Sequence, residues 1–336
     1  MTQAGDIAMN RREFLTRSAK AAAAVAATGA AAWLLRDTVG PAAQPETAAV
    51  ELADFSVPEM AGRMAIATGS DRAATVRAAL NGLGGIGQFV AKGDRVVLKV
   101  NAAFATPPGL SATTHPVLLA EVVRLCREAE AAEVIVTDNP INDAASCFAL
   151  TGLAGAARAA GAEVFLPRDD AFAPVSVPGA RLIVDWPVLH RPLEGADKLI
   201  GLAPLKHHER SGASMTLKNW YGLLGGRRNI FHQDIHTIIA ELARMVRPTL
   251  VILDGTTTMI RNGPTGGSLD DLAATNTMIV STDAVAADAF GATLLGKTAD
   301  DLAYIRLAER AGAGTADWQS LRPVRVSAEQ GGEGSE

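Results

Sequence analysis

Lysine, histidine and glycine residues are concentrated in one segment, residues 203–226. It contains Lys206, His207, His208, Lys218, Asn219, Gly212, Gly222, Gly225 and Gly226. Glycines let the backbone approach a ligand, and backbone amides together with lysine side chains make an anion site. The segment therefore predicts recognition of a phosphate or a carboxylate. The alternative is a mobile, solvated basic loop, and the spacing matches neither common glycine-rich nucleotide motif.

Other polar residues follow predicted strands. They are Lys99 with Asn101; Thr113, Thr114 and His115; Asp138 with Asn139; Lys206 to His208; and Asp254 with Gly255. Ligands of parallel α/β sheets bind beyond the carboxyl ends of the strands. These groups are therefore expected to share one pocket at that edge of the sheet.

A divalent metal is the candidate cofactor, because imidazoles and carboxylates are common metal ligands. The residues considered are His207, His208, His232, His236, Asp234, Asp254 and Asp283, with Asp254 and Asp283 as the carboxylate ligands. His232 and His236 are four residues apart, which predicts one shared helix face. The alternative is a helix N-terminus at which Asp234 favours the dipole. Adjacent residues of a strand point to opposite sides, so at most one of His207 and His208 faces the site.

No serine nucleophile is indicated, since none of the serines lies in a Gly-x-Ser-x-Gly unit. A desolvated lysine, Lys99 or Lys206, would serve as a base or a Schiff-base residue. A structural ion pair with Asp138 or Asp254 is the alternative for either lysine.

The elements that must position these groups alternate between strands and helices. The predicted strands are 63–68, 95–100, 133–138, 164–166, 198–202, 249–254 and 278–281. The predicted helices are 71–83, 115–130, 143–160, 234–245, 283–295 and 300–311. Such alternation predicts an α/β fold with a mainly parallel, Rossmann-like layered sheet and helices on both faces.

The first residues have the pattern of an export signal. Arg11 and Arg12 precede Glu-Phe-Leu and an apolar run of about 15 residues, short of the roughly 20 needed to span a bilayer. We interpret residues 1–43 as a twin-arginine (Tat) signal, 44–60 as a linker, 61–322 as the α/β domain and 323–336 as a disordered tail. The Tat translocase is then a partner during export, and the periplasm is the predicted location. Without cleavage the signal would remain as a tether.

The overall composition excludes some functions. The formal net charge is −5 and aromatic residues make up 4% of the chain, so binding to nucleic acid is not expected. The two cysteines, Cys126 and Cys147, do not form a Cys-x-x-Cys unit, and no 4Fe-4S cluster is expected. Cys126 lies in an apolar helical pattern that favours a buried thiol, although a disulfide could form in an oxidising compartment.

The ordered motifs resemble those of the DUF362 family over roughly residues 62–300. They include Val97-Leu98-Lys99-Val100-Asn101, Thr113-Thr114-His115-Pro116, Val134-Ile135-Val136-Thr137-Asp138, Leu205-Lys206-His207-His208, Leu217-Lys218-Asn219-Trp220-Tyr221-Gly222, His232, Ile252-Leu253-Asp254-Gly255, Gly263-Pro264-Thr265-Gly266 and Ser281-Thr282-Asp283-Ala284-Val285-Ala286-Ala287-Asp288.

This resemblance carries limited implications. Some relatives have a ferredoxin-like segment with clustered cysteines, which this chain lacks, so an iron–sulfur function does not transfer. The family's Lys-Pro-Asn and Lys-Thr-His units stand here as Lys-Val-Asn and Lys-His-His. The outer residues persist, which favours Lys99, Asn101, Lys206 and His208 over His207.

The leading hypothesis is a periplasmic enzyme acting on a small anionic substrate, by metal-assisted hydrolysis or by redox or isomerase chemistry. The candidate catalytic residues are Lys99, Lys206, His208 and His232, and the candidate substrate-binding residues are Asn101, Thr114, His115, Lys218, Asn219 and Gly222. One alternative is a non-catalytic factor that carries a metal or cofactor to another exported enzyme. Another is a structural component of a complex.

Overall fold

The computed structural model describes residue 12, residues 15–16 and 18–23, and residues 51–328. The described residues between 12 and 23 are helical. The predicted signal and linker, including Arg11, fall largely outside the described residues. No helix in the described part of the chain is both long enough and apolar enough to cross a membrane.

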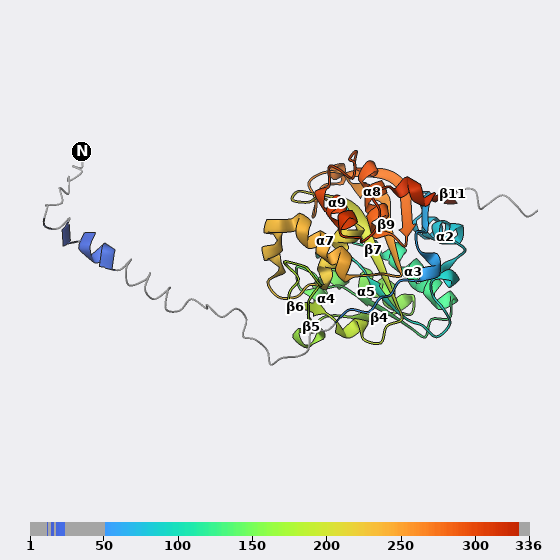
Figure 1. The fold of residues 1–336 in the computed structure, drawn as a ribbon, viewed down its shortest axis with the longest axis horizontal. Coiled ribbons are helices and arrows are strands. Elements are labelled where there is room, and N and C mark those ends of the chain that lie inside the picture. Colours follow the sequence, from blue (N-terminus) through green and yellow to red (C-terminus); the bar gives the residue numbers. More distant parts are fainter. Residues whose placement is uncertain (1–11, 13–14, 17, 24–50, 329–336) are drawn as a thin grey trace, which may run out of the picture. The chain divides into compact units, whose positions relative to one another are not determined.

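Residues 51–328 are built around one mixed sheet (Figure 1). Within this range its strands pair in the order β11-β1-β10-β9-β7-β2-β3-β4, and β8 adds to β7. The bounds are β1 (Met64–Thr68), β2 (Arg95–Lys99), β3 (Glu133–Thr137), β4 (Glu163–Phe165), β7 (Lys198–His208), β8 (Gly212–Ser214), β9 (Leu250–Met259), β10 (Leu272–Ser281) and β11 (Val324–Ser327). Neighbours are parallel except where β10 or β8 takes part. The α/β class is therefore confirmed.

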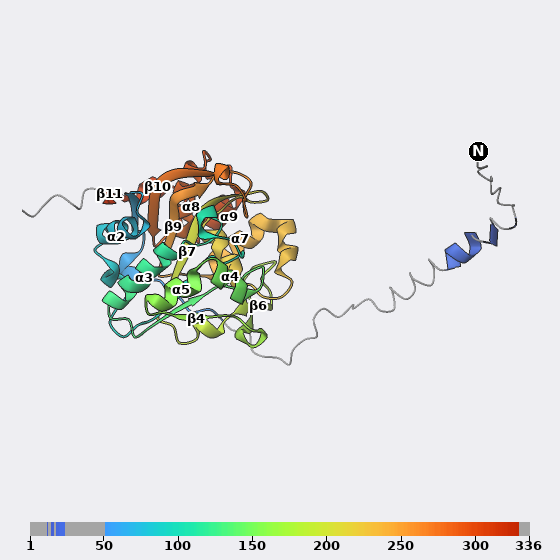
Figure 2. The same cartoon turned by 180° about the vertical axis from the view of Figure 1, so that it is seen from behind.

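Helices cover both faces of this sheet. They are α2 (Arg72–Gly82), α3 (Pro116–Glu128), α4 (Ala144–Leu150), α5 (Leu153–Ala159), α6 (Thr216–Asn219), α7 (Ile235–Met245), α8 (Ala284–Leu294) and α9 (Ala303–Arg310). Helix α3 packs against α2 and α5, whereas α9 packs against α7 and α8. Figures 1 and 2 show these two groups of helices, one with α2, α3 and α5 and the other with α7, α8 and α9, from opposite sides.

Short 3₁₀ helices connect these elements. They are η1 (Pro58–Met60), η2 (Ile86–Gln88), η3 (Pro108–Leu110), η4 (Asp169–Ala171), η5 (Arg191–Leu193), η6 (Trp220–Leu223), η7 (Arg228–Asp234), η8 (Leu269–Asp271) and η9 (Trp318–Leu321). An antiparallel hairpin, β5 (Phe172–Val175) with β6 (Trp186–Leu189), lies outside the main sheet.

The two helical layers enclose two hydrophobic cores, and the strands contribute to both. In β2, Val96 and Leu98 belong to the core under α2 and α3, whereas Val97 belongs to the core under α7 and α8. Successive side chains of a strand point to opposite faces, so a continuous apolar run is buried on both sides. The same alternation directs Lys99 toward the side of Val97, where α6 lies.

Several boundaries differ from the sequence-based prediction. The predicted helix 143–160 is two helices, because Gly152 adopts a left-handed conformation (φ of 74°) between them. The predicted strand 278–281 begins at Leu272 and runs antiparallel to β1 and β9. The predicted tail begins with a strand, because Val324–Ser327 pairs with the otherwise open edge of β1. Phe55 of the predicted linker is buried and bonded to Arg247.

Candidate functional site

A cavity of about 170 Å³ lies at the carboxyl ends of β2, β3 and β7, and we call it the basic cavity. Its lining brings together most of the predicted site residues. The lining residues are Lys99, Asn101, Ala103, Phe104, Asp138, Asn139, Ile141, Lys206, His208, Ser214, Lys218, Asn219, Tyr221, Gly222, Arg228, His232 and Pro264. Four of them are basic side chains of lysine or arginine, and one is a carboxylate.

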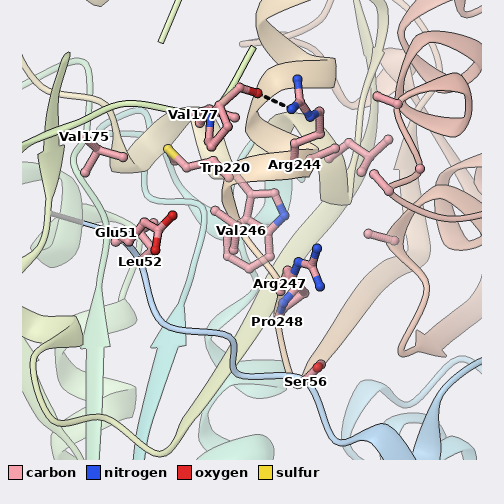
Figure 3. Close-up of a pocket in the computed structure, with 18 of the residues that line it drawn as sticks. Glu51, Leu52, Ser56, Val175, Val177, Trp220, Arg244, Val246, Arg247 and Pro248 are labelled. Carbon is pink, nitrogen blue, oxygen red and sulfur yellow. Dashed lines mark hydrogen bonds between the residues drawn. The ribbon is translucent and has the colours of Figure 1, made fainter. Parts of the chain in front are cut away.

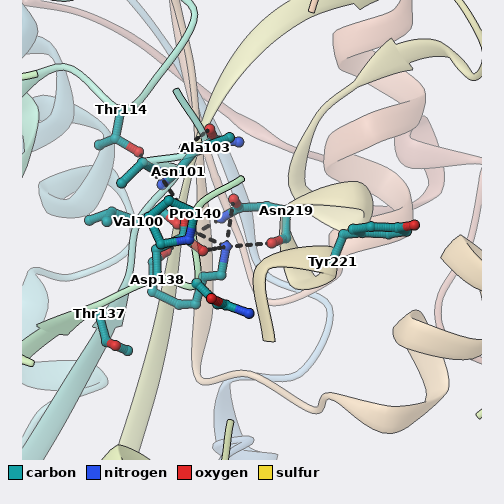
Figure 4. Close-up of polar contacts among 12 residues, drawn as sticks. Val100, Asn101, Ala103, Thr114, Thr137, Asp138, Pro140, Asn219 and Tyr221 are labelled. Atoms are coloured by element: carbon teal, nitrogen blue, oxygen red, sulfur yellow. Dashed lines mark hydrogen bonds and ion pairs between the residues drawn. The ribbon is translucent and has the colours of Figure 1, made fainter. Parts of the chain in front are cut away.

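Lys99 is held by contacts within the protein. Its ammonium lies 2.7 Å from the Asp138 carboxylate and donates to the carbonyls of Val100 (2.9 Å) and Asn219 (2.5 Å) and to the Asn219 side-chain oxygen (3.1 Å). Figure 4 shows Asp138 and Asn219 on either side of these converging contacts. An ammonium has three donors, so Lys99 has none left for a ligand. The contacts assign it a structural role rather than the predicted catalytic one.

The side chain of Asn219 is also fully hydrogen-bonded within the protein. Its amide nitrogen donates to the carbonyls of Lys99 (3.3 Å) and Leu202 (3.2 Å), while its oxygen accepts from Lys99. Asn219 thereby ties α6 to the ends of β2 and β7. It was predicted to bind substrate, but its polar atoms hold the site together.

Gly222 lies directly over the Lys99–Asp138 ion pair. A Cβ atom at this position would come 1.9 Å from the Asp138 carboxylate and 2.5 Å from the Lys99 ammonium. The Gly222 carbonyl also accepts from the amide of Asn139 at 2.9 Å. A side chain cannot be accommodated there without displacing the ion pair.

Lys206 and Lys218 supply positive charge that no carboxylate neutralises directly. The Lys206 ammonium donates to the Ala112 carbonyl and lies 5.2 Å from the centre of the Phe104 ring. Within residues 51–328, the ammonium of Lys218 makes no hydrogen bond or ion pair, and it lies 5.1 Å from the Tyr221 ring centre. Burial and neighbouring cations lower the pKa of Lys206 to about 7 and that of Lys218 to about 8.

Arg228 completes the positive wall of the basic cavity. Its guanidinium donates to the carbonyls of Asn139 (2.7 Å), Pro140 (2.8 Å), Tyr221 (3.1 Å) and Leu224 (3.1 Å). Carbonyl groups satisfy its donors without cancelling its charge. Burial lowers the pKa of Arg228, but a guanidinium remains protonated in proteins.

His208 is buried and neutral. Burial, followed by the charges of Lys218 and Lys206, lowers its pKa to about 2. Its Nδ1 accepts from the backbone amides of Arg210 and Ser211, both at 3.2 Å. Because a neutral imidazole has one donor and one acceptor nitrogen, Nε2 carries the proton. His208 therefore offers an N–H donor to a ligand.

His232 has the opposite tautomer. Its Nδ1 lies 3.2 Å from the Asn229 carbonyl and 3.2 Å from the Tyr221 hydroxyl, which itself donates to the Arg228 carbonyl at 2.5 Å. The carbonyl requires a proton on Nδ1, so Nε2 is left as an acceptor. Burial and Lys218 lower the pKa of His232. The rings of His208 and His232 stack with centroids 6.3 Å apart.

Thr114 anchors the loop that follows β2 to strand β7. The Thr114 hydroxyl accepts from the amide of Asn101 (2.7 Å) and donates to the carbonyl of Leu202 in β7 (2.8 Å). Thr114 is fully buried and does not line the basic cavity, whereas Asn101 does. The loop carries Phe104 to its place over Lys206.

Helix α6, which carries Lys218 and Asn219, is anchored by Asp288 of α8. The Asp288 carboxylate accepts from the amide and hydroxyl of Thr216 (2.8 and 2.5 Å) and from the amide of Leu217 (3.2 Å). Burial raises the pKa of Asp288 to about 7. Carboxylates bind well to the free amides of a first helical turn, so Asp288 positions the lysine of the basic cavity.

Besides Thr114, three residues of the predicted site lie outside this cavity. His115 caps α3, with its Nδ1 accepting from the amide of Val117, and burial lowers its pKa to about 4. Asp254 forms an ion pair with Arg72 at 2.8 Å. Asp283 caps α8 through the amide of Ala286.

The histidines do not form the predicted cluster. His207 faces away from the cavity, and its Nδ1 accepts from the amide of Gly263 at 3.2 Å. His236 stacks on Tyr304, with ring centroids 6.2 Å apart, whereas His232 lies in η7. The two do not share a helix face because α7 begins only at Ile235. Among the described residues, no group of three or more His, Cys, Asp or Glu side chains is arranged to hold a metal ion.

A larger cavity of about 570 Å³ lies at the amino-terminal side of β9 (Figure 3). Its titratable lining residues are Glu51, Arg244 and Arg247. Arg244 donates to the Pro178 carbonyl and Arg247 pairs with Asp54. Since it is at the opposite end of the strands from the usual ligand-binding edge and is not lined by lysine or histidine, the basic cavity is the stronger candidate.

Some members of the site were not singled out from the sequence. Tyr221, Phe104 and Asp288 follow no strand end and match no spacing rule. Two other members of the site were indicated by position, because Arg228 directly follows the glycine-rich segment and Asp138 directly follows β3. Their contacts were not.

Comparison with known proteins places this fold and site in a family. The domain of unknown function DUF362 matches residues 96–293. A thylakoid-associated protein from Synechocystis sp. is 31% identical over 209 residues, which cover 58% of this chain and 61% of that protein. The chain thus spans less than two thirds of that relative's length.

Among solved structures, the lactate racemase apoprotein from Thermoanaerobacterium thermosaccharolyticum aligns with a TM-score of 0.36 and 15% identity, covering 70% of this chain and 60% of that one. This likeness is too weak to bear on function. The family match is stronger evidence than this structural likeness. It covers more than half of the 336 residues and includes every basic residue of the cavity. The chain belongs to the DUF362 family.

Proposed function

We propose that this protein is an enzyme that binds a small organic anion, bearing a carboxylate or a phosphate, in the basic cavity. The observation that carries the proposal is the charge balance of the lining. Lys206, Lys218 and Arg228 converge on a cavity whose one carboxylate, Asp138, is already paired with Lys99.

Uncompensated buried charge favours an anion. Removing one partner of a buried ion pair costs roughly 3–5 kcal/mol, because it leaves the other charge without compensation. Lys218 has no partner within residues 51–328, and the contacts of Lys206 and Arg228 are to carbonyls. A bound carboxylate or phosphate would supply the missing negative charge and accept the free donors of Lys206 and Lys218.

The two histidines supply a hydrogen-bond donor and a proton acceptor in this proposal. His208 presents an N–H group and His232 presents a lone pair, and both rings line the same cavity. His208 can therefore donate a hydrogen bond to one atom of a bound anion, and His232 can accept a proton from another. Lys206, with a pKa of about 7, is a further group able to exchange a proton near neutral pH.

Export through the twin-arginine route is part of the proposal, and the Arg11-Arg12 pair supports it. The protein would then act in the periplasm. Cell fractionation of the wild type and of a variant with both arginines replaced by lysine tests this. The variant should remain in the cytoplasm, and unchanged periplasmic accumulation would contradict the export proposal.

Calorimetric titration with acetate, sulfate and inorganic phosphate tests anion binding. Lys206→Met and Lys218→Met should each weaken binding at least about tenfold, because each removes a charge-assisted contact. Lys198→Met is the matched control, since Lys198 lies at the other end of the strand that carries Lys206. Equal affinity in all four proteins would overturn the proposal.

Elemental analysis of the purified protein distinguishes the enzyme from a carrier. A metal that is bound tightly and transferred to an acceptor protein, without turnover of any organic anion, would fit the carrier function and contradict the proposal.

A further inference from the structure

A second cavity of about 800 Å³ adjoins the basic cavity, and we call it the outer cavity. The two share five lining residues: Asn139, Ile141, Tyr221, Arg228 and His232. These side chains therefore stand at the junction of the two spaces. The two cavities thus lie side by side along these five side chains.

Aromatic and proline rings form part of the walls of the outer cavity. Phe172 and Pro187 come from the β5–β6 hairpin, and Pro167 precedes it. Ile141 at the junction is 63% exposed. The charged side chains among its remaining lining residues, Arg168 and Asp169, are exposed. Aromatic and proline rings of this kind pack against rings or hydrocarbon chains.

Two glycines of the outer-cavity lining allow close packing of their turn against the β5–β6 hairpin. A Cβ atom on Gly225 would come 2.7 Å from the Phe172 ring, and Gly226 has a φ of 58° with Pro187 3.2 Å from its Cβ position. The backbone of this turn thus lies directly on the hairpin. Trp186 fixes it there by donating to the Gly225 carbonyl at 3.2 Å.

The sizes of the two cavities suit different parts of one molecule. At roughly 30 Å³ per water-sized group, a cavity of 170 Å³ has room for about six heavy atoms. That is the size of a carboxylate or phosphate that carries one or two carbons. The 800 Å³ of the outer cavity is within the range of roughly 300–1,000 Å³ that holds drug-sized ligands.

We infer that the substrate is an amphiphilic organic anion, with its anionic group in the basic cavity and a larger apolar body in the outer cavity. This inference rests on the proposed anion-binding function and names the substrate class. His232 lines both cavities, whereas His208 lines the inner one alone. The atoms that join the anionic group to the body therefore lie beside the His232 ring.

Calorimetry with inorganic phosphate, phenyl phosphate and 2-naphthyl phosphate tests this inference on the whole chain. Each added ring should tighten binding, and the naphthyl ester should bind at least about tenfold more tightly than inorganic phosphate, because apolar surface is removed from water.

Asn229→Trp should fill the outer cavity from an exposed position of its lining. It is expected to remove the gain from the naphthyl group and leave the affinity for inorganic phosphate unchanged. Asn81→Trp, at an exposed position of α2, is the matched control. Asn229→Ala should retain the gain, and thermal unfolding checks that each variant is folded.

The outcomes separate the two proposals. If none of the three phosphates binds and acetate does not bind either, the proposed function fails. If inorganic phosphate binds but the aryl esters bind no more tightly, or if the gain survives in Asn229→Trp, anion binding stands and the two-part substrate is wrong.

Discussion

The ammonium of Lys99 and the carboxylate of Asp138 lie 2.7 Å apart with almost no exposure to solvent, 1% and 3% of the respective side chains. Burial lowers the pKa of Lys99, and the charge of Asp138 opposes that shift. The pair joins the ends of β2 and β3 beneath Gly222. The other residues that line the basic cavity lie around this buried ion pair.

Replacing one partner of this pair should destabilise the fold. Lys99→Met is expected to lower the free energy of unfolding by roughly 3–5 kcal/mol, because Asp138 becomes a buried charge without compensation. The double variant Lys99→Met/Asp138→Asn should lose less than the single variant. Urea denaturation measures the unfolding free energy of both variants. Equal losses in the single and the double variant would show that the Lys99–Asp138 pairing does not determine the stability.

Gly222→Ala tests the close approach over the pair. The added methyl group would overlap the Asp138 carboxylate and the Lys99 ammonium, so a loss of at least roughly 1–3 kcal/mol in unfolding free energy is expected. The control is Gly155→Ala, in the middle of α5, where nothing lies within 4 Å of the new atom. That change should be neutral or stabilise by up to about 1 kcal/mol. A tolerated Gly222→Ala would contradict the geometry.

Anion binding should weaken as the pH rises through the range in which the cavity lysines titrate. The pKa of Lys206 is about 7 and that of Lys218 about 8, so both ammonium groups are charged below this range and neutral above it. Sulfate keeps its charge throughout and is the suitable probe. Its affinity should fall at least about tenfold between about pH 6.5 and pH 9.

Binding should also raise both lysine pKa values and take up protons near neutral pH. Calorimetry in buffers with different ionisation enthalpies measures this uptake. An affinity that does not depend on pH would mean that neither lysine contacts the anion.

The tautomers of the two cavity histidines can be observed directly. Nitrogen NMR of the imidazole rings should show the proton of His208 on Nε2 and that of His232 on Nδ1. Because the pKa of His208 is about 2, its signals should stay those of a neutral ring from about pH 5 to pH 8. A charged His208 in this range would contradict its assignment as a neutral N–H donor.

Asp288 should make stability depend on pH. Its pKa is raised from 3.8 to about 7, so between these values the folded state retains a proton that the unfolded state has lost. The stability this provides is present below about pH 4 and is lost as the pH rises through 7. Asp288→Asn lacks the effect, so the wild type should lose on the order of 1–3 kcal/mol relative to the variant between about pH 5 and pH 8.

Asp143→Asn is the control for that comparison. Asp143 caps α4, and hydrogen bonds with Ser146 lower its pKa, so it is ionised in both states over this range. Urea unfolding at the two pH values should show no such difference for Asp143→Asn. A wild type whose stability runs parallel to that of Asp288→Asn would mean that Asp288 is ionised in the fold.

Local patterns were sufficient for the architecture and for placing the candidate site at one edge of the sheet. The β-branched run at residues 95–100 predicts a strand buried on both faces, and Asp71 caps α2 as its position before an apolar helix suggests. Because parallel strands end at the same edge, Lys206 and His208 could be placed near Lys99 without coordinates. These are consequences of side-chain period and chain direction, which neighbouring residues determine.

The role of each side chain depended on contacts between distant segments. Lys99 and Asn219 are 120 residues apart, and only their meeting shows that both are fully bonded and that Lys206 and Lys218 are the lysines left for a ligand. His236 and Asp254 have the right chemistry for a site, but they pack against Tyr304 and Arg72. The sequence by itself determined at which edge of the sheet the candidate residues gather. The tertiary structure decided which donors and charges there remain unpaired, because a polar group is available to a ligand only when no other part of the chain satisfies it.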